Sequence, residues 1–338
     1  MAGKRMRAGG AAGVLEAVTL GGGSPARVLA AAGLAADDLA DPDRMIDSAR
    51  MAALFAAAAV ELDDPCFGLH LGRTYDFASV GPVAYAVLNA PTVGIGLDNF
   101  ERYGRTHLQG GRIAVERAGG EARLTYDLGL ADREAARHLG EGAAVVGVTL
   151  LRRLIGAEWR PRRVLFGHAR PHDTAEHART FAVPLAFGEA TTAALVFAAG
   201  DLERPVPNAD RSLLPIVERH LDERLASAAE GWLTEVRSAV AEAVCDGAPT
   251  IQAMAERLGL SVRTLQRRLA DEGIVFKTLV ADVRRDLALR YLADGKTDLT
   301  EIAFLVGYSE LSAFDRAFRR WTGSTPRAAR RSLTQSSA

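Results

Sequence analysis

The chain has 338 residues, of which 48% are hydrophobic and 25% are charged, so it can bury a sizeable core and its length favours two domains. Its net charge of −1 does not by itself point to a polyanionic partner. The two cysteines, Cys66 and Cys245, lie far apart in different predicted domains, which argues against a disulfide framework and favours a reducing cytosol.

No segment of the sequence suits a membrane. The most apolar run, Met51–Val60, is shorter than the about 20 residues that a spanning helix needs. The N-terminal residues mimic a signal peptide only faintly, because Glu16 interrupts an apolar stretch that is rich in glycine and poor in leucine. We therefore expect a cytoplasmic protein with no membrane partner, in which residues 1–12 are disordered.

The first two thirds of the chain mix helical and strand patterns. Two runs of alternating polarity, Arg112–Arg117 and Ala122–Leu128, flank Gly119-Gly120 and predict a β-hairpin. Other segments predict helices and short strands. The helices are expected at Ser48–Leu62, Leu97–Leu108, Asp132–Ile155 and Asp210–Leu225. The strands are expected at Arg163–His168, Val183–Phe187 and Ala194–Ala198.

These elements predict an α+β domain over residues 13–227, and the composition changes beyond it. A linker of small residues, Ala226–Gly231, precedes a segment, 232–331, whose patterns are all helical. Residues 231–338 carry 16 Lys and Arg against 13 Asp and Glu, which gives +3, whereas the rest carries 25 basic and 29 acidic residues, which gives −4. This asymmetry agrees with a C-terminal part that binds DNA.

A short pattern occurs twice in the C-terminal segment. The copies share their apolar spacing and a turn glycine, and Gly259 and Gly307 stand 48 residues apart. The first copy, within 250–271, is Ile251, Met254, Ala255, Leu258, Gly259, Leu260 and Ser261. The second copy, within 298–322, is Leu299, Ile302, Ala303, Val306, Gly307, Tyr308 and Ser309. Each copy predicts a helix, a glycine turn and a second helix rich in arginine, which is a helix-turn-helix motif.

Capping residues support both motifs. Thr250 and Ser261 can cap the two helices of the first copy, because their hydroxyls can accept free N–H groups of the first turn. Asp298 and Glu301 have capping-box spacing at the start of the second copy. Between the motifs, residues 277–293 have helical apolar spacing, and these 17 residues make a rod of roughly 25 Å. A linker helix of that length can hold two helices about one DNA turn, near 34 Å, apart.

The second helix of each motif leaves polar side chains on its outer face. An α-helix fits the major groove of DNA, where arginine can bind O6 and N7 of guanine with two hydrogen bonds while hydroxyls and further arginines hold phosphates. An arginine-rich helix face is usually only exposed to solvent, so a single helix-turn-helix copy would be weak evidence for DNA binding. Two copies of the motif make that evidence strong. The outward residues of the first motif are Arg263, Thr264, Gln266, Arg267 and Arg268. Those of the second are Ser312, Asp315, Arg316, Arg319 and Arg320.

Residues 232–331 resemble the DNA-binding domain of the AraC/XylS family of bacterial transcription regulators. The resemblance is carried by Ile251–Arg268 and, most specifically, by Leu299–Pro326. One departure is Ala329, where family members usually carry an aromatic residue. The resemblance implies base contacts by Arg263, Gln266 and Arg267 in the first motif and by Leu311, Ser312 and Arg316 in the second.

The preceding residues, about 24–225, resemble the arabinose-binding-like sensing domain of ornithine- and virulence-type regulators in that family. The matching pieces are Val28–Asp43, Gly81–Pro91, Phe100–Tyr103, Arg163–Phe187, Pro205-Val206-Pro207 and Asp210. The resemblance implies an unknown small-molecule effector and dimer formation, and it makes RNA polymerase a further expected partner. Candidate pocket residues, each with a plain alternative as a packing or surface residue, are Tyr75, Phe77, Tyr85, Asn89, Tyr103, His107 and Arg112.

One cluster of the first domain raises an enzyme or metal hypothesis. Its composition suits a metal ion, and its members are His168, His172, Asp173, Glu176 and His177. Pro171 prevents His168 and His172 from sharing one helical face, and Asp173 with Glu176 has the spacing of a helix start. No serine-nucleophile elbow, P-loop or dinucleotide fingerprint stands out. We therefore expect no enzyme activity, no metal and no cofactor.

The chain is thus predicted to be a transcription regulator that binds a specific site on double-stranded DNA and responds to a small-molecule effector. Its predicted fold is an α+β sensing domain followed by an all-α domain with two helix-turn-helix motifs joined by a linker helix. The alternative is a small-molecule-binding protein whose C-terminal helical domain mediates protein contacts. Specific DNA affinity that falls steeply with salt separates the two. Activation and repression are both left open.

Overall fold

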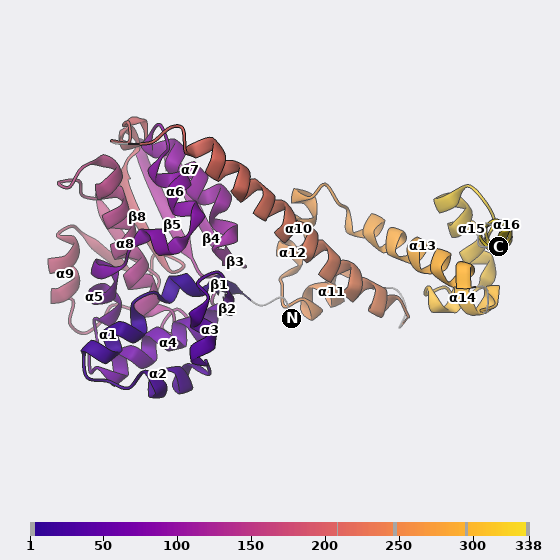
Figure 1. Cartoon of the computed structure of the whole chain (residues 1–338), viewed down its shortest axis with the longest axis horizontal. Helices are drawn as coiled ribbons and strands as arrows, with labels where there is room; N and C mark the ends of the chain where they lie inside the picture. Colours follow the sequence, from indigo (N-terminus) through magenta and orange to yellow (C-terminus); the bar gives the residue numbers. More distant parts are fainter. Residues whose placement is uncertain (1–3, 208, 246–248, 295–296, 336–338) are drawn as a thin grey trace. The chain divides into compact units, whose positions relative to one another are not determined.

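A computed structural model describes residues 4–207, 209–245, 249–294 and 297–335 (Figure 1). The chain divides into two compact units, Gly3–Ala226 and Ser227–Ala338, here called the N-terminal unit and the C-terminal unit. The first combines sheets and helices and the second is helical, which confirms the predicted fold class. In the described part of the chain no helix is long and apolar enough to cross a bilayer.

The N-terminal residues form the middle strand of a small sheet. β1 (Arg5–Arg7) pairs antiparallel with β2 (Met45–Asp47) on one side and with β3 (Leu108–Gln109) on the other. Met6 is buried in the core beside this sheet. The expectation of disorder in residues 1–12 is therefore wrong for residues 4–12, since three residues are too few to show a strand period and their partners are distant in sequence.

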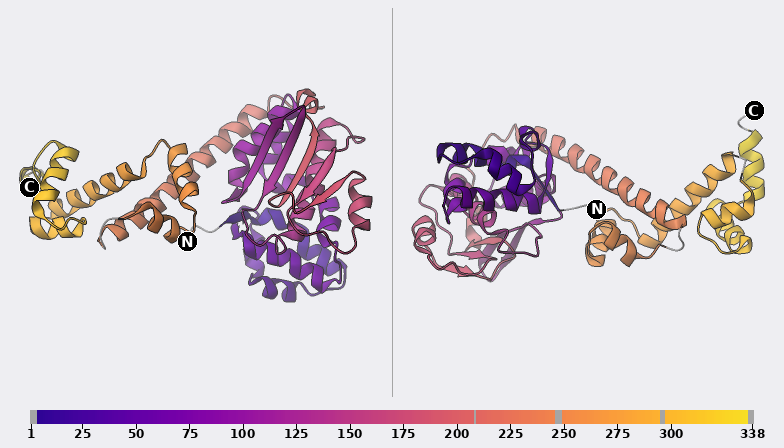
Figure 2. Two further views of the ribbon diagram at one scale, coloured as in Figure 1. Left: turned by 180° about the vertical axis from the view of Figure 1, so that it is seen from behind. Right: turned by 90° about the horizontal axis from the view of Figure 1, so that it is seen from below.

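Five helices from the first part of the chain gather beside this sheet (Figure 2). They are α1 (Val14–Leu20), α2 (Pro25–Ala32), α3 (Ala36–Ala40), α4 (Ser48–Glu61) and α5 (Phe67–Thr74). α4 confirms the predicted helix, and Asp47 caps it by accepting the N–H groups of Ala49 and Arg50. One face of α4 packs into the core through the buried side chains of Met51, Leu54 and Phe55.

The larger sheet has five strands in the order β4-β5-β8-β6-β7. All neighbours are antiparallel except β6 and β7. The strands are β4 (Arg112–Ala118), β5 (Glu121–Asp127), β6 (Arg163–Phe166), β7 (Leu185–Phe187) and β8 (Ala193–Ala198). The hairpin predicted around Gly119-Gly120 is confirmed, because both glycines adopt the positive φ of a tight hairpin turn. Further helices of this unit are α6 (Pro82–Leu88), α7 (Val93–Tyr103), α8 (Arg137–Ile155) and α9 (Ala175–Phe181).

α5 and α8 cross at glycines, so their backbones meet without a side chain between them. A Cβ atom on Gly68 would lie 2.0 Å from the carbonyl oxygen of His138. A Cβ atom on Gly72 would lie 2.8 Å from the carbonyl oxygen of Gly142. Both distances are shorter than any normal contact, so only glycine fits at this crossing.

Three helices differ in extent from the sequence expectation. α7 covers Val93–Tyr103 rather than Leu97–Leu108, and Leu108 belongs to β3. α8 begins at Arg137 rather than Asp132, whose carboxylate instead accepts N–H groups of Glu134 and Ala135 in a turn before the helix. α10 (Leu214–Cys245) is one helix that continues through the expected linker 226–231. The small residues of that segment are mostly alanine, which has the highest helix propensity, so a composition taken for a linker supports a helix.

The C-terminal unit contains the second part of α10 and six further helices. They are α11 (Ile251–Arg257), α12 (Val262–Asp271), α13 (Phe276–Asp294), α14 (Leu299–Leu305), α15 (Leu311–Thr322) and α16 (Pro326–Gln335). Gly323 ends α15 with a positive φ of 74°, as expected. Pro326 then starts α16, a helix that the sequence analysis did not foresee, and Ala329 packs against the common core.

Candidate functional site

Both helix-turn-helix motifs close with the same backbone hydrogen bond. In the first, the N–H of Leu260 donates to the carbonyl oxygen of Ala255 at 2.8 Å. In the second, the N–H of Tyr308 donates to the carbonyl oxygen of Ala303 at 2.9 Å. The repeat in the sequence therefore corresponds to a repeat in geometry.

The turn glycines have the backbone conformation that the repeat predicts. Gly259 has φ 65° and Gly307 has φ 77°, in the left-handed region that residues with a Cβ rarely adopt. The helix starts differ between the motifs. Ser261 caps α12 by accepting the N–H of Thr264 at 3.1 Å, as predicted, whereas Glu310 at the start of α15 makes no side-chain capping bond. The two recognition helices are thus similar but not identical.

α12 presents a polar face whose members differ in exposure. Arg263, Gln266 and Arg267 are exposed, while Leu265 and Leu269 are buried on the opposite face. The other two candidate DNA contacts are half-buried: the Thr264 hydroxyl lies 2.8 Å from the Ser261 hydroxyl, and the Arg268 guanidinium lies 5.6 Å from the centre of the Trp232 ring. Arg268 therefore takes part in packing within the unit.

α15 repeats this arrangement with larger inward side chains. Phe314 and Phe318 are fully buried, and the Trp321 ring packs beside them. Four of the candidate DNA contacts are exposed: Ser312, Arg316, Arg319 and Arg320. Leu311 and Asp315 are half-buried, and Leu311 packs against the core.

Both helix-turn-helix motifs pack against α13. Its inward residues are Leu279, Val283, Ala288 and Leu292, which are buried in a core that includes residues of α12 and α15. α12 and α15 lie toward opposite ends of α13 in Figure 1. Its 19 residues span roughly 28 Å, close to the rise of one DNA turn. Arg284 of α13 also stacks on Tyr308, 5.0 Å from the ring centre, and so braces the second turn.

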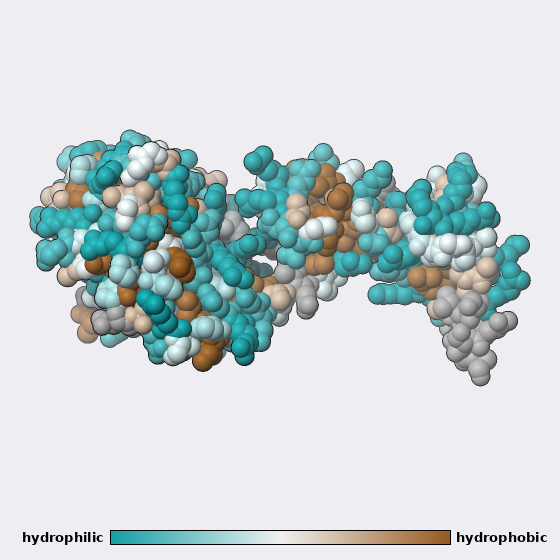
Figure 3. Space-filling model, turned by 90° about the horizontal axis from the view of Figure 1, so that it is seen from above, coloured by the Kyte–Doolittle hydropathy of each residue, from teal (hydrophilic) through white to brown (hydrophobic). Residues whose placement is uncertain are grey.

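The N-terminal unit contains an apolar cavity of about 100 Å³, partly open to solvent, between α5, α8 and the larger sheet. Tyr75, Phe77 and His107 of the candidate pocket residues line it. Tyr85, Asn89, Tyr103 and Arg112 do not. The sequence analysis missed Met6 and Gly10, which line the cavity from the N-terminal segment that was expected to be disordered. By contrast with this lining, the face of the unit visible in Figure 3 is mostly hydrophilic.

The polar groups at the cavity are held in their neutral forms. Burial, and secondarily the positive charge of Arg7, lowers the pKa of His107 to about 4. Burial also raises the pKa of Tyr75 and of Tyr126. The Tyr75 hydroxyl donates a hydrogen bond to the carbonyl oxygen of Gly9 at 3.0 Å. At neutral pH this cavity wall therefore carries an uncharged imidazole and two uncharged phenols.

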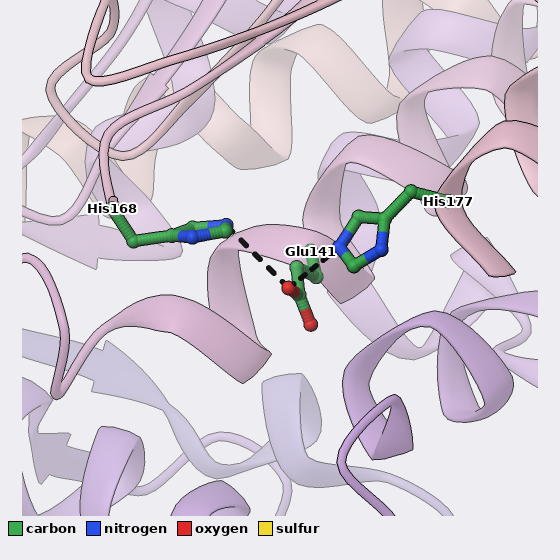
Figure 4. A group of neighbouring side chains, drawn as sticks. All are labelled: Glu141, His168 and His177. Carbon is green, nitrogen blue, oxygen red and sulfur yellow. Dashed lines mark hydrogen bonds and ion pairs between the residues drawn. The ribbon is translucent and has the colours of Figure 1, made fainter. Parts of the chain in front are cut away.

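A second polar group of the N-terminal unit lies around Glu141 on α8 (Figure 4). His177 Nε2 is 2.8 Å and His168 Nε2 is 3.5 Å from Glu141 Oε1, and all three side chains are buried. Arg137 Nε donates to the same oxygen at 2.9 Å. Burial alone raises the pKa of Glu141, but the nearby imidazoles of His138 and His177 and the charge of Arg137 outweigh it and lower the pKa. Glu141 is therefore ionised.

Of the five residues in the metal hypothesis, the structure brings His168 and His177 together and adds Glu141. His172 and Asp173 are exposed, and the Glu176 carboxylate pairs with Arg73 and Arg179. The ligand atoms of Glu141, His168 and His177 lie within 4.8 Å of one another, which is a spacing that a divalent cation could bridge. Arg137 already compensates the carboxylate, so we interpret the group as a paired buried network that ties α8 to α9 and to the end of β6.

Comparisons with known proteins agree with this geometry. The arabinose-binding domain of AraC transcription regulators matches residues 22–206, and a helix-turn-helix domain matches residues 254–332. The transcriptional regulator VirS of Mycobacterium tuberculosis is 30% identical over 287 residues, which cover 84% of each protein. The ornithine utilization regulator of Pseudomonas aeruginosa is 31% identical over 274 residues, which cover 78% of each protein.

The crystal structure of the regulator CdpR from Pseudomonas aeruginosa aligns with a TM-score of 0.45 at 25% identity, over 90% of this chain and 95% of its own, and the assignment does not depend on it. The family models cover both units, and the relatives are transcription regulators rather than enzymes. The chain therefore belongs to the AraC family of transcription regulators, with an N-terminal ligand-binding domain and a C-terminal helix-turn-helix domain that binds DNA.

Proposed function

We propose that this regulator binds a specific operator by inserting α12 and α15 into two successive major grooves. The observation that carries the proposal is the repeated turn geometry on a shared linker helix, with exposed arginines at equivalent places, Arg267 and Arg316. An arginine on such a face can bind guanine with two hydrogen bonds. The length of α13 suits the spacing of successive grooves.

The exposed polar residues have separate roles in this proposal. Arg263, Gln266 and Arg267 contact bases from α12, and Ser312 and Arg316 contact bases from α15. Arg319 and Arg320, near the end of α15, hold phosphates and so fix the register. The half-buried candidates, which orient the two helices at the edge of the contact, are Thr264, Arg268, Leu311 and Asp315.

The N-terminal unit supplies the regulation. An effector in its cavity changes DNA binding only if it binds the DNA-competent and DNA-incompetent states with different affinity. A second copy of the chain and RNA polymerase are the further partners that we propose, in the bacterial cytoplasm where the DNA lies. Dimer formation is part of this proposal, and sedimentation of the free protein tests it directly.

Sequencing of DNA fragments captured from the genome by the full-length protein identifies the operator. Arg267→Ala or Arg316→Ala should weaken binding to that operator by about 1–3 kcal/mol and relax base choice. Arg267→Lys retains the charge but not the two-bond geometry, so it should lose specificity while keeping the salt dependence. Arg50→Ala, an exposed arginine of α4, is the control for loss of charge alone.

Wild-type affinity and base choice in both alanine variants would contradict the assignment of α12 and α15. A protein with no specific DNA affinity at any salt concentration would favour the alternative, in which the C-terminal unit mediates protein contacts.

A further inference from the structure

The cavity of the N-terminal unit constrains the chemistry of the molecule that enters it. The residues that line it include the aromatic rings of Phe55, Tyr75, Phe77, Phe100 and Tyr126. Among its lining residues, all of which fall in the described part of the chain, there is no Asp, Glu, Lys or Arg. A charged group that entered would lose its water without meeting an opposite charge, and that desolvation is expensive in an apolar site.

The nearest fixed charge is already paired. Arg7 is buried close enough to His107 to lower the pKa of the imidazole. Its guanidinium forms an ion pair with Asp43 and donates to the carbonyl oxygen of Val80. The Nε of Arg7 has no hydrogen-bond partner among the described residues, but Arg7 does not line the cavity and Asp43 already balances its charge, so we do not assign an anion site there.

Polar side chains also belong to the cavity wall, namely His107, Tyr75, Thr125 and Tyr126. His107 is 4% exposed, and its Nδ1 is buried without a hydrogen-bond partner within the structure as described. Buried polar atoms are nearly always satisfied, and an unpaired one costs stability. Because the imidazole is neutral, its two nitrogens offer one donor and one acceptor. The imidazole of His107 and the hydroxyls of Thr125 and Tyr126 can therefore meet a hydrogen-bonding group on an otherwise apolar ligand.

Size sets a further limit. The cavity holds about 100 Å³ and is partly open to solvent, whereas a closed apolar cavity of about 150 Å³ admits benzene. Helix α8 contributes Gly142, Ala143 and Gly147 to the wall. An aromatic ring or a short alkyl chain can therefore place part of its apolar surface in the cavity and extend toward the opening.

We infer that the cavity binds an uncharged, largely apolar molecule built on an aromatic ring or a short alkyl chain, with a hydrogen-bonding group that meets the imidazole of His107. The inference predicts that sugars, amino acids and carboxylates do not bind deeply in it. The inference rests on the proposed function only in taking this ligand as the effector. Ligand binding is measured without DNA, so the ligand inference and the proposed DNA-binding function can fail separately.

The test uses the full-length protein and calorimetry at neutral pH, with thermal denaturation as a second readout. The probes are 4-ethylphenol, ethylbenzene, benzoate, L-ornithine and L-arabinose. We expect 4-ethylphenol to bind at one site and raise Tm, and ethylbenzene, which lacks the hydroxyl, to bind about tenfold more weakly because one buried hydrogen bond is lost. The three charged or highly polar probes should leave Tm unchanged.

Three variants locate the site. Ala143→Phe fills the cavity from α8 and should abolish binding of both neutral probes, whereas Thr149→Phe, on an exposed position of the same helix, should not. His107→Phe should remove the difference between the two probes. Binding of benzoate, ornithine or arabinose that Ala143→Phe abolishes would overturn the inference, as would absence of binding by the neutral probes. Loss of specific DNA binding would contradict the proposed function instead.

Discussion

The two units carry their functional residues in opposite ways. In the C-terminal unit each recognition helix, with its turn and its helix start, lies within one short stretch, 250–271 or 298–322. In the N-terminal unit the cavity gathers residues from Met6 to Leu195. The candidate DNA contacts are mostly exposed, whereas the cavity residues and the Glu141 network are mostly buried.

Substitutions should therefore act differently in the two units. An exposed arginine can be replaced with little effect on folding, so its loss should change DNA affinity alone. A buried polar group in the N-terminal unit is held by several elements at once, so its loss should change stability first and DNA affinity only indirectly. Four substitutions or changes of condition test this separation.

The largest effect is expected from Glu141→Ala. It leaves His168 and His177 buried, and Arg137 half-buried, without the carboxylate that joins them, and breaking such a network costs about 3–5 kcal/mol of unfolding free energy. Denaturant unfolding measures the loss, and Glu158→Ala, an exposed position, is the control. Chelator should not lower the Tm of wild type; a marked drop would show that a metal holds the network.

Gly307→Val should disrupt the second turn. A β-branched side chain resists the positive φ of this position, so we expect a loss of about 2–3 kcal/mol and a shortened footprint on the operator. Gly307→Asn keeps access to the left-handed region and should retain most of the stability. An unchanged footprint and melting curve in the valine variant would refute the assigned turn.

Acidification should destabilise the N-terminal unit. The pKa of His107 is lowered to about 4 in the folded chain, against about 6.5 when unfolded. The unfolded chain therefore binds more protons than the folded chain below pH 6.5. As the pH is lowered, the free energy of unfolding decreases, and it stops decreasing near the pKa of His107 in the folded chain. Between pH 7.5 and pH 5 the expected loss is about 2 kcal/mol. His107→Gln should flatten this part of the profile, and an equally steep profile in that variant would exclude His107 as the cause.

Ser261→Ala should have the smallest effect and should distinguish the two motifs. Loss of the capping bond to the N–H of Thr264 costs about 1 kcal/mol. Ser309 stands at the equivalent place in the second copy, but Glu310 occupies the helix start there, so Ser309→Ala should be nearly neutral. Equal losses in the two variants would show that the motifs begin alike.

Much of the C-terminal unit could be predicted from the sequence because its determinants are local. Apolar spacing, Gly259, Gly307 and the capping residues specify each motif within a few residues of one another, and all have the predicted geometry. The exposure of Arg263, Arg267, Ser312 and Arg316 also agrees with the prediction. The stacking of Arg268 on Trp232 could not be foreseen, because Trp232 belongs to another helix.

The N-terminal unit was predicted less well because its determinants are long-range. The hairpin at Gly119-Gly120 and the strands were found from local patterns, but the strand order and the pairing of β1 depend on contacts between distant segments. No local sequence pattern distinguishes Glu141 from the other residues of its helix. Only the fold brings it to His168 and His177, and only the fold turns Met6 toward the cavity.

The glycine crossing of α5 and α8 has a mechanical consequence. Where side chains separate two helices, a small shift of one can be absorbed by a change of rotamer. At Gly68 and Gly142 no rotamer exists to yield, so α5 must follow any displacement of α8. α8 also forms part of the cavity wall and carries Glu141. A ligand that displaces α8 would therefore also displace α5, instead of causing only a local change of side-chain conformation.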